Sequence, residues 1–396
     1  MRKYCGTPRE TIPFKIMDFF VDIYANLFYK KRKLAPINHD APRILVASLG
    51  HLGDALTVTY MFPLIKKTYP NATIDLLTAQ WCEPVNLNNP YVNQTIYINH
   101  FQTNRRKISH WEKIKDFYRT FRQALPVLRQ ADYDFYIDIR YSDAVAHFVL
   151  PFISVKKAYG FSRRALGGLL DKEFDVPTHE FHHFDMYFML LREIGVKGTF
   201  ADIEPYFPID RHSAPANVSF EKIQEKIGSM NEPFFMLFPE SGGEHKQLSV
   251  TFWAKLIELI LEKHQLKVLL CGQTTMSKQI LALVADTFKN QVIDTSAKVS
   301  IQEIGVLSQN AKFALTLDSF PEHFCCIFGK TITIFKGTGY PFFPLANFPV
   351  YLIHNHKPSV GLPFERDNVE IVYQENVETD AVKTLVLNKI NIFLDE

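Results

Sequence analysis

The feature that most constrains this chain is an alternation of short apolar segments with longer amphipathic ones, which occurs twice. In the first half the apolar segments are 43–49, 73–79, 94–99, 135–140 and 156–161. In the second half they are 234–240, 267–272, 291–297, 313–318 and 331–337, with further candidates at 349–355 and 369–373. Short buried strands alternating with helices predict βα units and a parallel sheet covered on both faces. We therefore predict an α/β chain with two doubly wound, Rossmann-like domains.

The two series are separated by a proline-rich stretch. Residues 198–233 hold Pro205, Pro208, Pro215 and Pro233 and are expected to be irregular, which is typical of a domain boundary. A chain of 396 residues is also long enough for two domains. The predicted division is an N-terminal extension, a first domain, a linker, a second domain and a C-terminal helix, at 1–40, 41–205, 206–232, 233–375 and 376–396.

The charge balance excludes one broad class of function. The chain has 44 Lys and Arg against 42 Asp and Glu, a net charge of +2. A protein that coats nucleic acid through bulk charge would be far more basic, so any anion site must be local. The five cysteines are odd in number and lack metal-ligand spacing, which favours a reduced, cytoplasmic location and no structural zinc.

The N-terminal extension predicts an amphipathic helix with two possible surroundings. Its apolar positions recur at helical spacing, at Ile16, Phe20, Ile23 and Leu27. A basic run, residues 30–33, follows. The helix could lie on a membrane surface, with the basic run on anionic lipid. The alternative is a helix packed on the body of the protein, with its basic end solvated. Charged residues interrupt the stretch, so it does not predict a membrane-spanning helix.

Ligands of doubly wound sheets bind at loops that follow the strands. The first such loop contains Gly50 and Gly53, which let the backbone approach a ligand closely, and ends at Asp54. It lacks the glycine pattern of dinucleotide sites and the lysine of P-loops, which excludes both. Asp54 begins the next helix, where a carboxylate either caps the helix or takes part in chemistry.

Two loops of the second half are also candidates. Ser241 and Gly242 expose backbone N–H groups and Lys246 adds a positive charge, so residues 239–246 form either a phosphate site or a solvated loop. Residues 318–323 lead from a strand into a helix and include Asp318, Ser319 and His323. There the side chains either cap the helix or line a site at the end of the strand. The run Arg105, Arg106 and Lys107 is either solvated or meets an anionic partner.

Six segments, in order, resemble glycosyltransferase family 9, the bacterial lipopolysaccharide heptosyltransferases. In the first half these are ILVASLGHLGDAL (44–56), the unit at 69–99, DYDFYIDIR (132–140) and HHFDMYFMLLREIGV (182–196). In the second half they are PFFMLFPESGGEHKQLSVTFWAKL (233–256) and ALTLDSFPEHFCCIFGKTITIFKG (314–337). The resemblance covers roughly residues 43–340. It implies the GT-B fold, in which an acceptor-binding and a donor-binding domain face each other across a cleft and the final helix can cross back.

The resemblance also implies roles for residues. Asp54, beside Gly50 and Gly53, matches the base that deprotonates the acceptor hydroxyl as it attacks the anomeric carbon, which implies inversion. Separately from the resemblance, the charge run Arg105, Arg106 and Lys107 is expected to meet phosphates or carboxylates of such an acceptor. The family's donor-side positions correspond to Ser241, Gly242, Lys246, Asp318, Ser319 and His323. Lys246 and the helix that follows Asp318 would neutralise the departing diphosphate, so no metal and no cofactor is expected.

The implied function is heptose transfer from ADP-heptose to a lipopolysaccharide or lipooligosaccharide core acceptor. The implied location is the cytoplasm, including a peripheral position at the inner membrane, and no nucleic-acid partner is implied. Two departures keep alternatives open. Phe320 replaces a family glycine, and residues 273–275 lack an acid suited to ribose. The alternatives are the same fold with another nucleotide sugar, or with a protein or capsule acceptor, and a catalytically silent binding scaffold.

Overall fold

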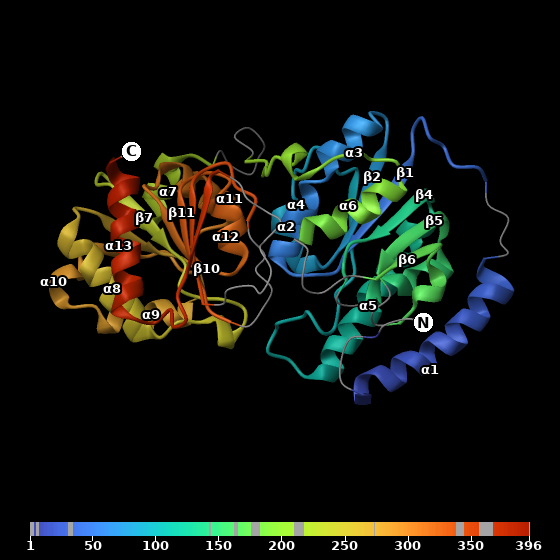
Figure 1. Ribbon diagram of the computed structural model, residues 1–396, viewed down its shortest axis with the longest axis horizontal. Helices are drawn as coiled ribbons and strands as arrows, with labels where there is room; N and C mark the ends of the chain where they lie inside the picture. Colours follow the sequence, from blue (N-terminus) through green and yellow to red (C-terminus); the bar gives the residue numbers. More distant parts are fainter. Residues whose placement is uncertain are drawn as a thin grey trace. The chain divides into compact units, whose positions relative to one another are not determined.

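The computed structural model describes residues 4, 8–30, 35–141, 144–161, 165–175, 183–209, 218–272, 274–337, 344–355 and 367–395. The chain divides into two compact units, unit 1 (Met1–Ile203) and unit 2 (Glu204–Glu396). Figure 1 shows that each unit consists of a sheet with helices on its faces. The prediction of two parallel α/β sheets is confirmed.

The sheet of unit 1 has six parallel strands in the order β3-β2-β1-β4-β5-β6. Their bounds are β1 (Arg43–Ser48), β2 (Thr73–Thr78), β3 (Gln94–Tyr97), β4 (Asp132–Asp138), β5 (Ser154–Phe161) and β6 (Lys172–Phe174). The chain builds outward from β1 to β3 and then returns to place β4 on the other side of β1. The carboxyl ends of β1 and β4 therefore form a topological switch point.

Helices cover both faces of this sheet, which explains its apolar strands: Ile44, Leu45 and Val46 of β1 are at most 1% exposed. The helices are α2 (Leu52–Thr59), α3 (Phe62–Thr68), α4 (Glu83–Asn86), α5 (His110–Arg129) and α6 (His183–Glu193). Short helical turns are η2 (Gln80–Cys82), η3 (Val145–Phe152), η4 (Gly167–Leu169) and η5 (Phe200–Asp202). The start of α5 is set by a capping box, in which Ser109 and Glu112 each accept a hydrogen bond from the other's backbone N–H.

The N-terminal extension forms α1 (Pro8–Tyr24), continued by the π-helical turn η1 (Ala25–Tyr29), at the outside of unit 1 (Figure 1). One face of this segment packs on the unit, because Ala25 and Tyr29 belong to its hydrophobic core. Of the predicted basic run, Lys30 is described and residues 31–33 lie outside the described residues. Among the described helices none is long and apolar enough to cross a membrane.

The sheet of unit 2 has seven parallel strands in the order β13-β12-β11-β10-β7-β8-β9. Their bounds are β7 (Phe234–Leu237), β8 (Lys267–Leu270), β9 (Val292–Asp294), β10 (Ala314–Leu317), β11 (Thr331–Phe335), β12 (Val350–His354) and β13 (Val369–Tyr373). The plan of unit 1 is repeated, since the chain builds outward from β7 to β9 and then returns to place β10 beside β7. The second switch point lies between β7 and β10.

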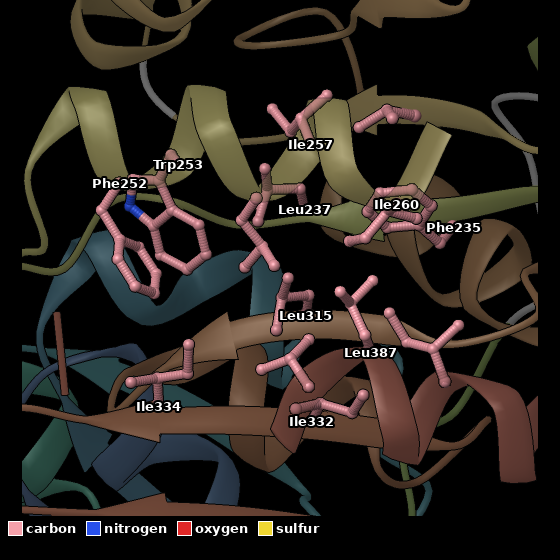
Figure 2. Packing of buried hydrophobic residues seen from close by; sticks show 14 of the residues in the cluster. Phe235, Leu237, Phe252, Trp253, Ile257, Ile260, Leu315, Ile332, Ile334 and Leu387 are labelled. Carbon is pink, nitrogen blue, oxygen red and sulfur yellow. The ribbon is translucent and has the colours of Figure 1, made fainter. Parts of the chain in front are cut away.

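The helices of unit 2 are α7 (Phe220–Ile227), α8 (Val250–Lys263), α9 (Thr274–Leu283), α10 (Asp286–Lys289), α11 (Ile301–Asn310), α12 (Phe320–Cys325) and α13 (Asp380–Asp395), with the turn η6 (Glu244–Lys246). Side chains of α8 and α13 meet those of β7, β10 and β11 in one core (Figure 2). Trp253 of α8 is fully buried there and is the largest side chain with less than 2% exposure. This core holds the loops after β7 and β10 in place.

One expectation about the connecting segment is wrong. Residues 220–227, placed in an irregular linker by the sequence pattern, form α7. The Ser219 hydroxyl caps this helix by accepting a hydrogen bond from the backbone N–H of Lys222. Ile223 is 1% exposed and packs in a cluster with Phe234. The apolar spacing of this short helix is helical, but the prolines on either side of it obscured the pattern.

Candidate functional site

The candidate loops lie at the switch points of the two sheets. In unit 1 the loop after β1 adjoins the loop after β4, because Ala47 is paired with Asp138 at the ends of the two strands. In unit 2 the loops after β7 and β10 are brought together in the same way. Open parallel sheets bind ligands in the crevice at such points. Each unit therefore carries one candidate site.

In unit 1 the site is built around Asp54, in the first turn of α2. Its Oδ2 accepts a hydrogen bond of 2.7 Å from the backbone N–H of His51 and one of 3.0 Å from Arg140 Nη1. The His51 ring nitrogen Nδ1 lies 3.7 Å from the same oxygen. The carboxylate thus caps the helix and takes part in an ion pair. Since 40% of its side chain remains exposed, a substrate can reach it.

Arg140 is the residue that sequence reasoning missed. It follows β4 by two positions, and its backbone N–H donates a 3.0 Å hydrogen bond to Asp138 Oδ1. The other oxygen of Asp138 lies 2.9 Å from His147 Nε2, and neither side chain is exposed. This buried pair supports the turn that carries Arg140. The available signal was the arginine at the end of segment 135–140, but its significance depends on β4 lying beside β1.

The charge of Asp54 is set by its neighbours. Although part of the side chain is exposed, the surrounding loops remove enough water to raise the pKa of this carboxyl group, but the Arg140 guanidinium and the hydrogen bonds from His51 outweigh that effect and hold the pKa well below its usual range. Asp54 is therefore a stable anion at neutral pH. Its strength as a proton acceptor will increase if Arg140 moves away.

Gly50 makes this arrangement possible. Its carbonyl accepts a 2.9 Å hydrogen bond from Trp81 Nε1, which fixes the loop. A Cβ atom on Gly50 would lie 2.5 Å from Arg140 Nη1 and would also collide with the Asp54 carboxylate. Only a glycine leaves room for the ion pair. Gly53, the other predicted glycine, lies one residue before Asp54 within α2.

Arg105 lies in a loop on the same edge of the sheet. The hydroxyl of Thr103 in this loop donates a 3.2 Å hydrogen bond to the carbonyl of Leu49, directly after β1. Arg105 is exposed, but partial loss of water around its guanidinium lowers its pKa, and the negative charge of Asp54 opposes that shift. Arg105 therefore adds positive charge near the Asp54–Arg140 pair.

Its predicted companions are placed differently. Arg106 forms an ion pair with Asp116 of α5 and donates a 3.3 Å hydrogen bond to Asn104. Lys107 is exposed. The Arg106 guanidinium is therefore already paired with a carboxylate of unit 1, although 55% of its side chain remains exposed.

In unit 2 the site is built around Lys246 and Asp318. Lys246 Nζ lies 2.5 Å from Asp318 Oδ2, and the side chains are 27% and 12% exposed. The Ser241 hydroxyl donates a 3.4 Å hydrogen bond to the carbonyl of Asp318. The loops after β7 and β10 are thus tied together, and they place a partly exposed ammonium group at the switch point. Gly242 is exposed beside Ser241.

The remaining predicted residues are at the start of α12. Ser319 occupies the N-cap position, but its hydroxyl donates to the carbonyl of Leu317 at 3.3 Å and does not cap the helix. His323 is 8% exposed, within the helix. Phe320, which replaces the family glycine, stacks on Phe324 with ring centroids 5.1 Å apart. Its ring therefore contributes to an aromatic cluster of unit 2.

Glu322 is a second residue that the sequence did not indicate. It is fully buried in the first turn of α12, and within the described residues neither carboxyl oxygen has a hydrogen-bond partner. Burial raises its pKa well above the usual value and the charge of Asp318 raises it further, against a smaller effect of Lys246. The uncharged form of Glu322 is therefore favoured.

The last feature of the sites is the placement of side chains that could bind a metal ion. Among the residues that the structure describes, no three His, Cys, Asp or Glu side chains are grouped so as to hold a metal ion. In the described part of the chain, four cysteines are buried and form no disulfide, namely Cys82, Cys271, Cys325 and Cys326.

This chain is similar to known proteins both in its sequence and in its fold. The model of glycosyltransferase family 9 (heptosyltransferase) matches residues 121–360. Lipopolysaccharide heptosyltransferase 3 of Escherichia coli is 22% identical over 299 residues, which cover 73% of this chain and 81% of that protein.

Solved structures share the architecture over nearly their whole length. The ADP-heptose lipopolysaccharide heptosyltransferase II of E. coli has a TM-score of 0.65 at 18% identity, covering 89% of this chain and 98% of that one. A family 9 glycosyltransferase from Veillonella parvula has a TM-score of 0.66 at 14% identity, covering 91% and 100%. E. coli heptosyltransferase WaaC, solved with ADP-2-deoxy-2-fluoro heptose, has a TM-score of 0.59 at 12% identity, covering 88% and 99%. The predicted GT-B fold is confirmed.

Proposed function

Because this chain belongs to glycosyltransferase family 9 (heptosyltransferase), we propose that it transfers heptose from ADP-heptose to a lipopolysaccharide core acceptor, with inversion at the anomeric carbon. The observation that carries this proposal is the reachable Asp54 carboxylate at the switch point of unit 1. Two similarities support the choice of substrates. The E. coli relative is a lipopolysaccharide heptosyltransferase, and the structurally similar WaaC has been solved with an ADP-heptose analogue and with ADP.

Asp54 acts as the general base. The acceptor hydroxyl oxygen forms a bond to the anomeric carbon of heptose while the bond from that carbon to the diphosphate oxygen breaks. The hydroxyl proton passes to Asp54, the bonding electrons leave with ADP, and direct displacement inverts the configuration. Proton transfer of this kind contributes roughly 10²–10⁴-fold to the rate. The anionic carboxylate also stabilises positive charge that develops on the sugar.

Arg140 determines how basic Asp54 is. In the ion pair at 3.0 Å its guanidinium lowers the pKa of Asp54 and weakens the base. A phosphate or carboxylate of the acceptor core would attract Arg140, and with it Arg105, away from the aspartate. The proton affinity of Asp54 would then increase when the acceptor is bound, which couples acceptor binding to catalysis.

Lys246 neutralises the leaving group. Its ammonium, now paired with Asp318 at 2.5 Å, turns to the diphosphate of the donor, with Ser241 and Gly242 alongside. A full positive charge at this point stabilises the negative charge that grows on ADP. Because α12 has only six residues, its N-terminus adds little to this effect. We propose that transfer needs neither a metal ion nor a cofactor, and that it therefore continues in the presence of EDTA.

The proposed location follows from the proposed acceptor. A lipid-linked core acceptor is presented at the cytoplasmic face of the inner membrane. The enzyme would act there as a peripheral protein.

The test is a transfer assay with purified chain, ADP-heptose and heptose-deficient lipopolysaccharide, followed by ADP release and by the mass of the product. Asp54→Asn is expected to lower kcat by about 10²–10⁴-fold and to leave ADP binding unchanged. Asp132→Asn is the matched control, because Asp132 is an exposed carboxylate at the start of β4 in the same unit. Full activity of Asp54→Asn would overturn the assignment of the base.

One observation favours a second candidate, a glycosyltransferase of this fold with another donor. Phe320 stands where the family has a glycine. Thermal stabilisation by a panel of nucleotide sugars distinguishes the candidates, because a ligand stabilises by RT ln(1 + [L]/Kd). A larger shift with another nucleotide sugar than with ADP-heptose would select the second candidate. Measurable turnover with any donor would exclude a catalytically silent scaffold.

A further inference from the structure

The segment formed by α1 and η1 has an inner face that fixes its orientation on unit 1. Ala25 is fully buried and Tyr29 is 6% exposed in the core of the unit. Asp18 is 2% exposed. Its carboxylate accepts hydrogen bonds of 2.6 Å from the Tyr4 hydroxyl and 2.7 Å from the backbone N–H of Leu166. Within the described residues, no element of unit 1 covers the opposite face of the segment, whose large apolar side chains are exposed.

That outer face is a continuous apolar ridge. It consists of eight large side chains that are 40–66% exposed, namely Ile12, Ile16, Phe19, Phe20, Ile23, Tyr24, Leu27 and Phe28. In the whole described part of the chain seventeen large apolar side chains are at least 36% exposed, and eight of them lie within residues 12–28. Isolated exposed apolar residues are normal in a soluble protein, but a contiguous group marks a surface that binds something.

In this segment the negative charges face the protein and the positive charges are exposed. Residues 11–30 contain two carboxylates, and both are turned toward the protein. Asp18 is buried, and Asp22 lies so close to Gly168 that a Cβ atom there would collide with its carboxylate. The cations Lys15 and Lys30 are exposed, and the sequence continues as Lys31-Arg32-Lys33. The outward side is therefore apolar and cationic.

We propose that the outer face of α1 and η1 docks this protein on an anionic lipid bilayer. An amphipathic helix of this kind lies in the plane of the interface with its apolar face about 5–10 Å deep, and basic residues add attraction to anionic headgroups. The charge pattern of residues 11–30 disfavours a second copy of this chain as the occupant. Two such ridges would bring Lys15 and Lys30 of each copy together, and among these described side chains both carboxylates face inward. This inference does not depend on which sugar is transferred.

The test is co-sedimentation of the full chain with vesicles of phosphatidylcholine alone and of phosphatidylcholine with phosphatidylglycerol. We expect binding that is stronger with phosphatidylglycerol and weaker at high salt. Phe19 and Phe20 are 62% and 64% exposed, so the double variant Phe19→Ser/Phe20→Ser should fold normally. It is expected to lower the vesicle partition coefficient by about tenfold or more for each phenylalanine removed.

The matched control is Leu283→Ser, which removes a side chain of 51% exposure from unit 2 and should not change binding. Lys30→Glu should reduce the preference for phosphatidylglycerol. Transfer to a detergent-solubilised acceptor should be unaffected by the double variant, which separates this inference from the proposed function. The membrane-docking proposal is overturned if the wild type binds neither kind of vesicle. It is also overturned if the wild type self-associates and the double variant does not, since the ridge would then bind a second copy of the chain.

Discussion

Replacing Gly50 by alanine tests the site of unit 1 most directly, because the change adds one methyl group between two functional side chains. The new Cβ would lie 2.5 Å from Arg140 Nη1 and 2.7 Å from Asp54 Cβ, and it would overlap the Asp54 carboxylate. Ordinary van der Waals contact begins at 3.4 Å, so these groups must separate by close to 1 Å. The ion pair of 3.0 Å between Asp54 and Arg140 cannot persist unchanged.

The expected loss of activity follows from this displacement. A catalytic group that is misplaced by about 1 Å can cost about 10²-fold in rate, so kcat should fall by about that factor. Stability should change little. Gly50 is absent from the glycines with positive φ, and alanine restricts the unfolded chain, which is worth about 0.4–1 kcal/mol in favour of folding. This gain offsets part of the steric cost.

The assay compares kcat and the melting temperature of the wild type, Gly50→Ala, Asp54→Asn and the double variant. If Gly50→Ala acts through Asp54, the double variant should be no slower than Asp54→Asn alone. An unchanged kcat in Gly50→Ala would refute the reasoning. The reasoning would also be refuted if Gly50→Ala lowered kcat by the same factor in the wild type and in Asp54→Asn.

Three further changes test other parts of the structure. Lys246→Met should weaken ADP binding by about 10–100-fold in a calorimetric titration, because a hydrogen bond to a charged group is lost. An unchanged affinity for ADP would show that Lys246 does not bind the donor. Arg140→Met removes the charge that lowers the pKa of Asp54 and leaves the burial that raises it, so the acidic limb of the pH profile of kcat/KM should move upward from below the ordinary value of 3.8. A profile that does not move would show that Asp54 is not the titrating base. Trp253→Ala should lower the free energy of unfolding by about 3–5 kcal/mol in denaturant titrations, since the side chain is fully buried; a loss below about 1 kcal/mol would contradict the packing in Figure 2.

The class of the fold and the positions of the candidate loops were readable from the amino-acid order. Buried strands and amphipathic helices have characteristic spacings of apolar residues that can be recognised locally. Segments 43–49 and 234–240 were therefore predicted as strands, and they form β1 and β7 with small differences at their ends. Asp54, Lys246 and Asp318 follow such strands, and the position after a strand is a local property. The same local character explains one error, because the flanking prolines concealed the helical spacing of 220–227.

Partners distant in the sequence were decided by the tertiary structure alone. Arg140 meets Asp54 only because β4 pairs with β1, and Lys246 meets Asp318 only because β10 pairs with β7. No local pattern shows that Arg106 forms an ion pair with Asp116. The two surroundings that the sequence left open for the N-terminal helix likewise depend on which face is buried. Strand order and helix docking are set by the packing of the whole core, and charges and hydrogen bonds at the sites then depend on that order.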